Sequence, residues 1–157
     1  MQTPKRPLVL YGLLVCLFIL AGAGLVGGAA FIIDPSGGLL KLSRDILRQV
    51  PINDFVLPGF FLFTVMGLFP LFLIYALWNQ PHWPWVERII GTHPLHWSWR
   101  LILGLAILLI LWIDLEFILF GYRAPIQIVM GLLAFVIIGL CLPRSLRDHL
   151  IAPPSID

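Results

Sequence analysis

The chain has 157 residues, of which 60% are hydrophobic and only 11% are charged, and its mean hydropathy is +0.99. A soluble domain of this composition would have too few polar side chains to cover its surface, so a water-soluble fold is excluded and lipid is the expected surroundings. The formal net charge of +2 comes from scattered residues, with no basic run longer than two, and gives no indication of nucleic-acid binding.

The first uncharged run covers residues 7–33 and follows Lys5 and Arg6. A secretory signal peptide has the same order of charge and apolar residues, but its apolar region is only about 7 to 15 residues long. We therefore expect this run to be the first transmembrane helix, because about 20 apolar residues cross a bilayer. Gly24 and Gly28 lie four residues apart in it, a spacing that predicts close packing against another helix.

Residues 39–50 follow the first span and have the pattern of an amphipathic helix. At about 100° per residue, the aliphatic side chains fall in one arc, and Lys41, Arg44, Asp45 and Arg48 fall in the opposite one. A helix of this kind lies on the membrane surface. We expect it to cap the transmembrane helices, and docking of a partner protein is the alternative.

The second uncharged run covers residues 55–78 and is also long enough to cross a bilayer. Pro58 falls in the first turn of this expected helix, where a missing N–H is tolerated. Pro70 falls in the middle, where a proline removes a helical hydrogen bond, and it predicts a kink.

Five of the six tryptophans lie between residues 78 and 99, where they predict an aromatic belt at one membrane interface. His93 and His96 lie in the same segment, three residues apart, which is a spacing compatible with metal ligands. Either histidine is a candidate axial ligand for a haem or chlorin at the interface. The simpler interpretation is that both are polar interface residues.

The third apolar run covers residues 101–120, and it contains two acids, Asp114 and Glu116. An acid within a membrane span costs roughly 2.5 to 3.5 kcal/mol by insertion scales, so both residues are candidates for a proton or cation site. Residues two apart on a helix point in nearly opposite directions, so the two carboxylates cannot share one proton or one metal. The interpretation we favour is a structural ion pair or interface anchor, with Arg123 or an arginine of the surface helix as the partner.

The fourth run covers residues 124–143 and has Pro125 in its first turn. All four runs must be helical, because strand backbone would be left unpaired in lipid. The predicted fold is therefore all-α. Residues 1–157 form a single integral membrane bundle of four transmembrane helices, with the amphipathic surface helix between the first and second.

An even number of crossings puts both termini on one side of the membrane, together with the segment between the second and third spans. That side carries Lys5, Arg6, Arg88, Arg100, Arg144 and Arg147, and the other side carries Lys41, Arg44, Arg48 and Arg123. Because cytoplasmic segments are richer in lysine and arginine, both termini are expected in the cytoplasm.

Three short stretches carry a resemblance to known proteins. They are Ile33-Asp34-Pro35-Ser36-Gly37 after the first span, Leu57-Pro58-Gly59 at the start of the second, and Trp112-Ile113 with Glu116 in the third. In this order they resemble small bacterial inner-membrane proteins with four spans. The resemblance implies a location in the bacterial plasma membrane, and it implies no activity and no binding residue.

No nucleophile lies at a suggestive spacing from a base, and no cysteine and histidine spacing forms a metal site, so we expect a protein that is not an enzyme. The leading expectation is an accessory or assembly subunit of a larger membrane complex, in contact with lipid and with other membrane subunits or further copies of itself. One alternative is an oligomeric ion- or proton-coupled channel or carrier that uses Glu116 or Asp114. The second alternative is a haem- or pigment-binding subunit. Under the other two hypotheses we expect no cofactor.

Overall fold

In the computed structural model the described residues are 6–40, 54–91, 94–122 and 124–151, and they are helical with no strand among them. In chain order the elements are α1 (Leu8–Ile33), η1 (Gly38–Leu40), α2 (Val56–Phe61), η3 (Leu62–Leu68), α3 (Phe69–Asn79), α4 (Pro84–Ile90), α5 (Trp97–Phe120), α6 (Pro125–Cys141) and α7 (Arg144–His149). The segments α2, η3 and α3 follow one another without a break and form one long helix, α2–η3–α3.

Three helical stretches are long and apolar enough to cross a membrane, namely Leu8–Ile33, Val56–Asn79 and Trp97–Leu119. The fourth apolar helix, α6, has 17 residues and is about 25 Å long. The prediction of an all-helical chain is therefore confirmed, and three to four of its helices are apolar and long enough to span a membrane. The predicted surface helix at residues 39–50 coincides with η1 only at its first residues, and the remainder lies outside the described residues.

Two helix bounds differ from those predicted by more than one residue. The helix α5 begins at Trp97, four residues before the predicted start at residue 101, because the His96 ring accepts a hydrogen bond from the backbone N–H of Ser98 and caps the helix. The helix α6 ends at Cys141, two residues before the predicted end at Pro143. Pro143 has no backbone N–H to continue the helical hydrogen bonds, which accounts for the earlier end.

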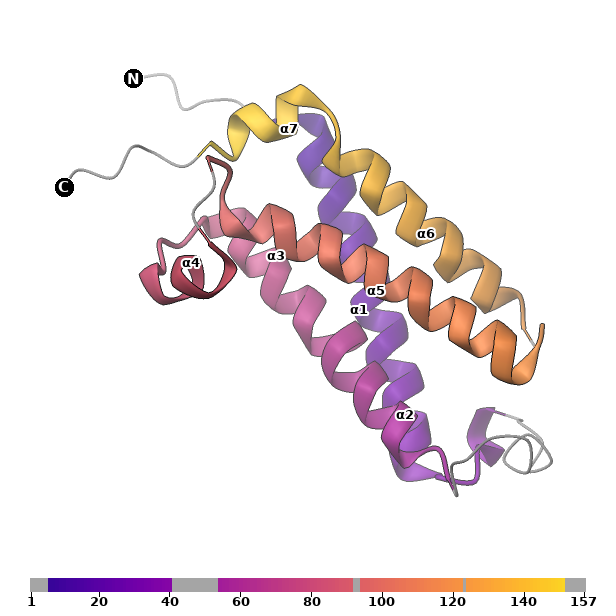
Figure 1. Cartoon of the computed structure of the whole chain (residues 1–157). Coiled ribbons are helices and arrows are strands. Elements are labelled where there is room, and N and C mark those ends of the chain that lie inside the picture. The colour runs from indigo at the N-terminus through magenta and orange to yellow at the C-terminus, as the bar shows by residue number, and fades with distance from the viewer. Residues whose placement is uncertain (1–5, 41–53, 92–93, 123, 152–157) are drawn as a thin grey trace.

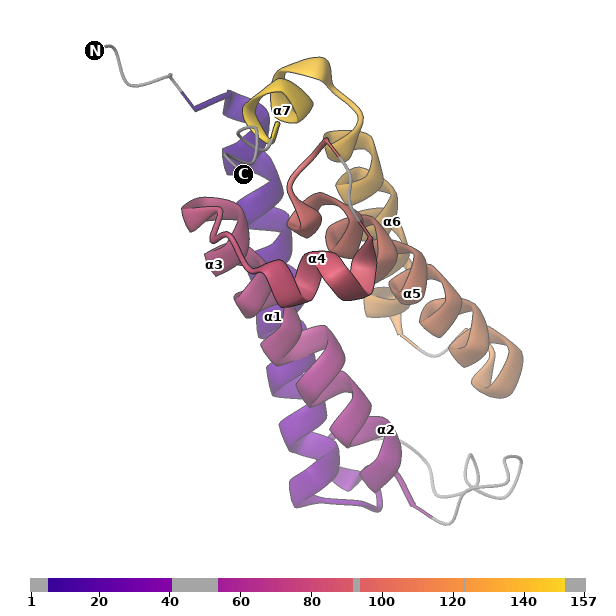
Figure 2. The same cartoon turned by 60° about the vertical axis from the view of Figure 1, so that its left-hand side comes forward.

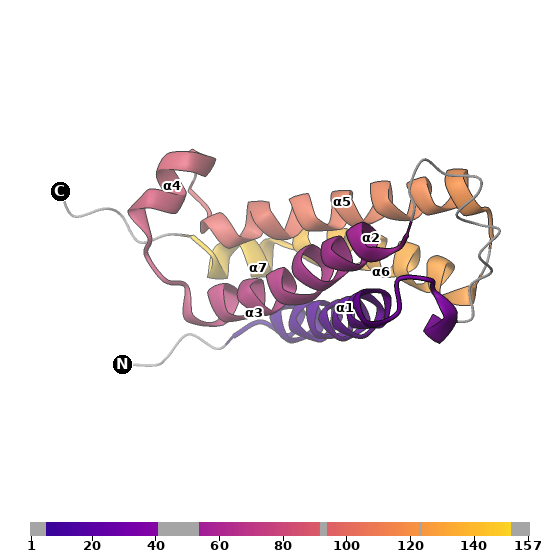
Figure 3. The same cartoon turned by 90° about the horizontal axis from the view of Figure 1, so that it is seen from below.

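The long helices form two pairs, as Figure 1 shows: α1 lies beside α2–η3–α3, and α5 lies beside α6. The two pairs are packed together at the end of the molecule that contains α7, which we call the closed end. They separate toward the end that contains η1 and the turn between α5 and α6, which we call the open end (Figure 1, Figure 2). Seen from below, α4 and α7 lie at the closed end and η1 lies at the open end (Figure 3).

The hydrophobic core occupies the closed half of the molecule. On α1 the fully buried leucines Leu10, Leu13 and Leu17 recur every three or four residues, so one face of the helix is buried throughout this half. Buried side chains of the other long helices belong to the same core, and they include Leu73, Leu77, Ile102, Leu105, Ala134 and Ile137. This packing fixes the two helix pairs relative to each other.

Beyond the core, the backbones of α1 and η3 lie in direct contact. A Cβ atom added to Gly24 would lie 2.3 Å from the carbonyl carbon of Met66, and one added to Gly28 would lie 2.4 Å from the amide nitrogen of Phe63. The partner of the predicted glycine face is thus the second long helix of the same chain. That helix widens to π-helical geometry over Leu62–Leu68, directly before Pro70, where the sequence predicts an interruption.

Candidate functional site

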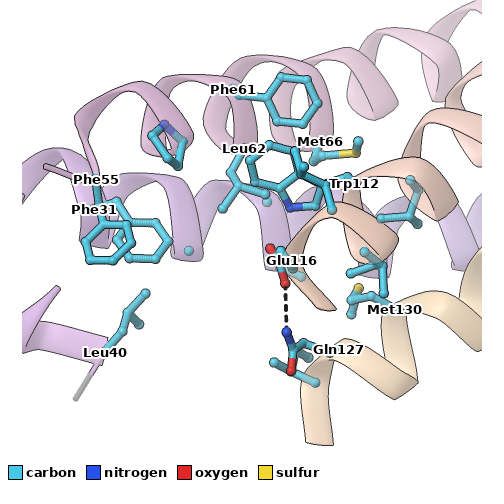
Figure 4. A pocket seen from close by; sticks show the side chains of 18 of the residues that line it. Phe31, Leu40, Phe55, Phe61, Leu62, Met66, Trp112, Glu116, Gln127 and Met130 are labelled. Atoms are coloured by element: carbon cyan, nitrogen blue, oxygen red, sulfur yellow. Dashed lines mark hydrogen bonds between the residues drawn. The ribbon is translucent and has the colours of Figure 1, made fainter. Parts of the chain in front are cut away.

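The separation of the two helix pairs leaves a cavity of about 800 Å³ on the open side of the core. Figure 4 shows side chains from both pairs that surround it. Its walls are almost entirely apolar and include Leu20, Val26, Phe31, Leu57, Phe61, Leu62, Met66, Leu109, Leu115, Ile126 and Met130. Among the lining residues of the described chain, Glu116 is the one side chain that can carry a charge.

Glu116 lies one turn before the end of α5 and is held by Gln127 of α6 (Figure 4). The Gln127 Nε2 group donates a hydrogen bond of 3.4 Å to Glu116 Oε2 and one of 3.5 Å to the Gly121 carbonyl. The Gln127 Oε1 atom accepts a hydrogen bond of 3.3 Å from the Ala124 backbone N–H. Because Gln127 is 5% exposed and both ends of its amide are engaged, it fixes the position of the Glu116 carboxylate.

Gln127 was not predicted as a site residue, although its position at the start of a helix is recognisable in the sequence. Gln127 is the third helical residue after Ala124, and a glutamine at this position commonly binds the backbone N–H at the start of its own helix. With Pro125 as the first helical residue, this signal marks the start of α6. Only the fold brings the same amide next to Glu116.

Two pairs of stacked aromatic rings form part of the cavity wall. Phe31 and Phe55 are stacked with their ring centroids 5.0 Å apart, and Phe61 and Trp112 are stacked at 4.4 Å. In Figure 4 the Trp112 ring lies between Phe61 and Glu116. The Trp112 indole N–H is buried and has no hydrogen-bond partner among the described residues.

The structure places the two predicted acids on different sides of α5. Asp114 is exposed and lies beside a smaller hollow between α5 and α6 that Phe117 and Ile128 also line. Glu116 faces the cavity. The ion pair predicted with Arg123 falls outside the described residues, as do the arginines of the predicted surface helix.

His96 is 6% exposed and its ring nitrogens both have protein partners. The Nδ1 atom lies 2.8 Å from the Ser98 hydroxyl oxygen, and the Nε2 atom lies 3.1 Å from the Pro81 carbonyl oxygen. A haem iron or a metal would have to displace one of these partners. Burial lowers the pKa of His96, and this effect outweighs the Pro81 carbonyl and the Glu87 carboxylate, which act in the opposite direction. Its candidate companion, His93, lies outside the described residues.

Several other aromatic and basic residues of the closed end contact one another. Trp83 stacks on Trp85 and on Trp97, with ring centroids 6.0 and 5.6 Å apart. The Arg6 guanidinium lies over the Trp78 ring at 3.6 Å from the ring centroid. In the described part of the chain, no group of three or more His, Cys, Asp or Glu side chains is placed to hold a metal ion. The cavity around Glu116 is therefore the candidate functional site.

No protein-family model, curated protein or solved structure matches this chain.

Proposed function

We propose that the chain is a multi-pass protein of the bacterial plasma membrane and that α1, α2–η3–α3, α5 and α6 all cross the bilayer. Consecutive long helices run in opposite directions (Figure 1), which is the arrangement that four crossings require. The helix α6 is shorter than a hydrocarbon core of about 30 Å, a mismatch that local thinning of the bilayer accommodates. The closed end carries Arg6, Arg88, Arg100, Arg144 and Arg147, and this charge supports a cytoplasmic location for both termini.

The function we propose for this membrane protein is the non-catalytic binding of a hydrophobic molecule in the cavity. One observation carries the proposal: a cavity of about 800 Å³ is lined by apolar side chains and contains a single carboxylate, held in place by Gln127. Small-molecule sites typically measure about 300 to 1,000 Å³ and combine apolar walls with a few fixed polar groups. The cavity has both properties.

The test uses two glycines of α1 on different faces. Gly27 lines the cavity, and an added Cβ atom would make only an ordinary contact of 3.9 Å with Leu62 Cδ1. Gly22 is exposed, and an added Cβ atom would have no neighbour within 4 Å. Gly27→Leu therefore fills part of the cavity, and Gly22→Leu is the matched control on the outer face.

The wild-type chain and both variants are purified in a mild detergent, and bound molecules are extracted with organic solvent and identified by mass spectrometry. We expect one hydrophobic compound to accompany the wild-type chain and Gly22→Leu in a fixed ratio, and to be depleted from Gly27→Leu. Recovery of the same compounds in the same amounts from all three proteins would contradict the proposal.

As a second candidate, we propose that the chain works as an accessory or assembly subunit of a larger membrane complex. The exposed face of α6 favours this role, because Val129, Leu132 and Val136 are about half exposed or more and Gly139 has open space beside it. A partner helix can approach closely at such a position. Mild solubilisation from the native membrane followed by size measurement tests this role, and migration only as a lone 17.7 kDa protomer would contradict it.

A further inference from the structure

We infer that the cavity takes a lipophilic cation, an apolar molecule with one fixed or protonated positive charge, and that Glu116 is its counter-ion. This inference rests on the proposed function and names the class of ligand. It is carried by three features of the cavity: its single carboxylate, its aromatic walls and its apolar rim.

The charge of the site indicates the charge of the ligand. Glu116 accepts a hydrogen bond from Gln127 and lies beside the Trp112 indole, and within the described residues it forms no ion pair. A carboxylate has room for about four hydrogen bonds or contacts with positive charge, so Glu116 retains capacity for a positively charged group in the cavity. In an apolar site a carboxylate is stabilised most by an opposite charge, and an anion would be repelled. A neutral apolar molecule would leave the carboxylate unpaired.

The aromatic walls favour the same class. The face of an aromatic ring carries partial negative charge and attracts a cation within about 6 Å of its centre. Phe31 with Phe55 and Phe61 with Trp112 form two such surfaces on the cavity wall, and Glu116 lies next to the second (Figure 4). These rings also offer large apolar surface to the non-polar part of a ligand. The site thus suits an amphiphile whose charge is surrounded by hydrocarbon.

The rim of the cavity indicates where the ligand comes from. Val26, Leu57 and Ile126 line the cavity and are 71%, 72% and 52% exposed. In the proposed orientation these side chains face lipid. A lipophilic cation concentrates in the bilayer and would meet an apolar entrance there, whereas a hydrophilic ion would have to leave water to reach it.

Two probes of the same size and shape but opposite charge test the inference. Tetraphenylphosphonium is a cation and tetraphenylborate is an anion, and both are apolar at their surface. Binding of each to the purified full-length chain in an uncharged detergent is measured by equilibrium dialysis. We expect saturable binding of the phosphonium at one site. Binding of the borate should be at least about thirtyfold weaker, because the borate would leave the Glu116 carboxylate without a positive partner.

The variants locate the effect. Glu116→Gln keeps the shape of the side chain and removes its charge, and it is expected to weaken phosphonium binding by about thirtyfold or more. Asp114→Asn, which removes an acid on the exposed side of α5, is the matched control and should bind like the wild type. Equal binding of the two probes to the wild type, or unchanged phosphonium binding by a folded Glu116→Gln variant, would overturn the inference.

Failure of the inference is distinguishable from failure of the proposed function. If both probes bind the wild type equally and Gly27→Leu blocks both, the cavity binds hydrophobic molecules without regard to charge, and only the inference is wrong. If neither probe binds and no compound accompanies the purified chain, the proposed function fails as well. If Glu116→Gln does not fold, the comparison of the two probes on the wild-type chain alone tests the inference.

Discussion

At the scale of single residues, His96 connects three parts of the closed end. Its ring contacts Ser98 at the start of α5 and the Pro81 carbonyl after α3, and its backbone N–H donates a hydrogen bond of 2.7 Å to the Leu150 carbonyl after α7. A neutral ring can accept at Nδ1 and donate at Nε2, which fits both ring partners. Protonation would remove the acceptor that caps α5.

Stability should therefore depend on the protonation of His96. Burial lowers the pKa of His96 in the folded chain, so between that pKa and the unfolded value of about 6.5 the unfolded chain binds more protons. The stabilisation is complete above about pH 6.5 and is lost as the pH falls through the folded pKa. Unfolding temperatures in detergent, measured from pH 8 to pH 5, are expected to fall with pH, and less steeply for His96→Gln.

His149 provides the comparison for this measurement. Burial, and then the nearby Arg6, lower the pKa of His149 as well, so it contributes pH dependence of the same sign. The His149→Gln variant should retain the part of the slope that His96 contributes, and the double variant should show a smaller slope than either single variant. A slope that is identical in His96→Gln and the wild type would show that His96 is not the titrating group.

The sequence predicted the acid of the candidate site but not its surroundings. Glu116 stands out because an acid within an apolar run is costly and therefore noticeable. Its observed partner, Gln127, lies on the next helix. The sequence signal of Gln127 concerns the start of its own helix and does not indicate a contact with Glu116. The aromatic wall comes from three helices, and no sequence spacing relates Phe31, Phe61 and Trp112. The direction in which the two helix pairs separate depends on packing between distant segments, so no local pattern in the sequence predicts it.

Among the helices, the glycine pattern of α1 predicted a close contact with another helix, and the structure shows that this helix is η3. Gly24 and Gly28 lie against η3, whereas Gly22 is exposed. Membrane helices associate by van der Waals packing, so positions where backbones touch contribute strongly. The absence of side chains at these two positions allows the contact.

Gly28→Ala is expected to lower the stability of the chain by about 1–3 kcal/mol, because the added methyl group would overlap the Phe63 backbone and push the helices apart. Gly22→Ala adds the same methyl group where nothing lies within 4 Å and should cost nothing. Reversible unfolding in mixed micelles measures both. Equal stability of the two variants would contradict the contact between α1 and η3.

The helix α4 shows what the sequence could not predict at this scale. We expected an aromatic belt between the second and third spans, and the structure adds a seven-residue helix, Pro84–Ile90, too short for a periodic pattern. Tertiary contacts define its end: Arg100 of α5 donates hydrogen bonds to the carbonyls of Ile90 and Gly91. The exposed Trp85 and Ile89 are suited to a membrane interface.

In the whole molecule, four crossings put the closed and open ends on opposite sides of a membrane. His82 lies near the closed end and Tyr122 at the open end, and both side chains are 58% exposed. With Cys16 and Cys141 replaced by serine, His82→Cys should react with a membrane-impermeant maleimide only from the cytoplasmic side, and Tyr122→Cys only from the other. Reaction of both cysteines from one side would contradict the four crossings.

The central claim is that a hydrophobic cation occupies the cavity beside Glu116, and the methionines allow a direct test. The chain has three methionines, and two of them, Met66 of η3 and Met130 of α6, line the cavity from opposite helix pairs (Figure 4). The protein is prepared deuterated, with ¹³C-labelled methionine methyl groups, in deuterated detergent, and tetraphenylphosphonium is added. We expect nuclear Overhauser effects from the phenyl protons to both methyl groups, and we expect Gly27→Leu to abolish them and Gly22→Leu to retain them. Phosphonium binding without an effect at either methyl group would place the ligand elsewhere and overturn the assignment of the cavity as its site.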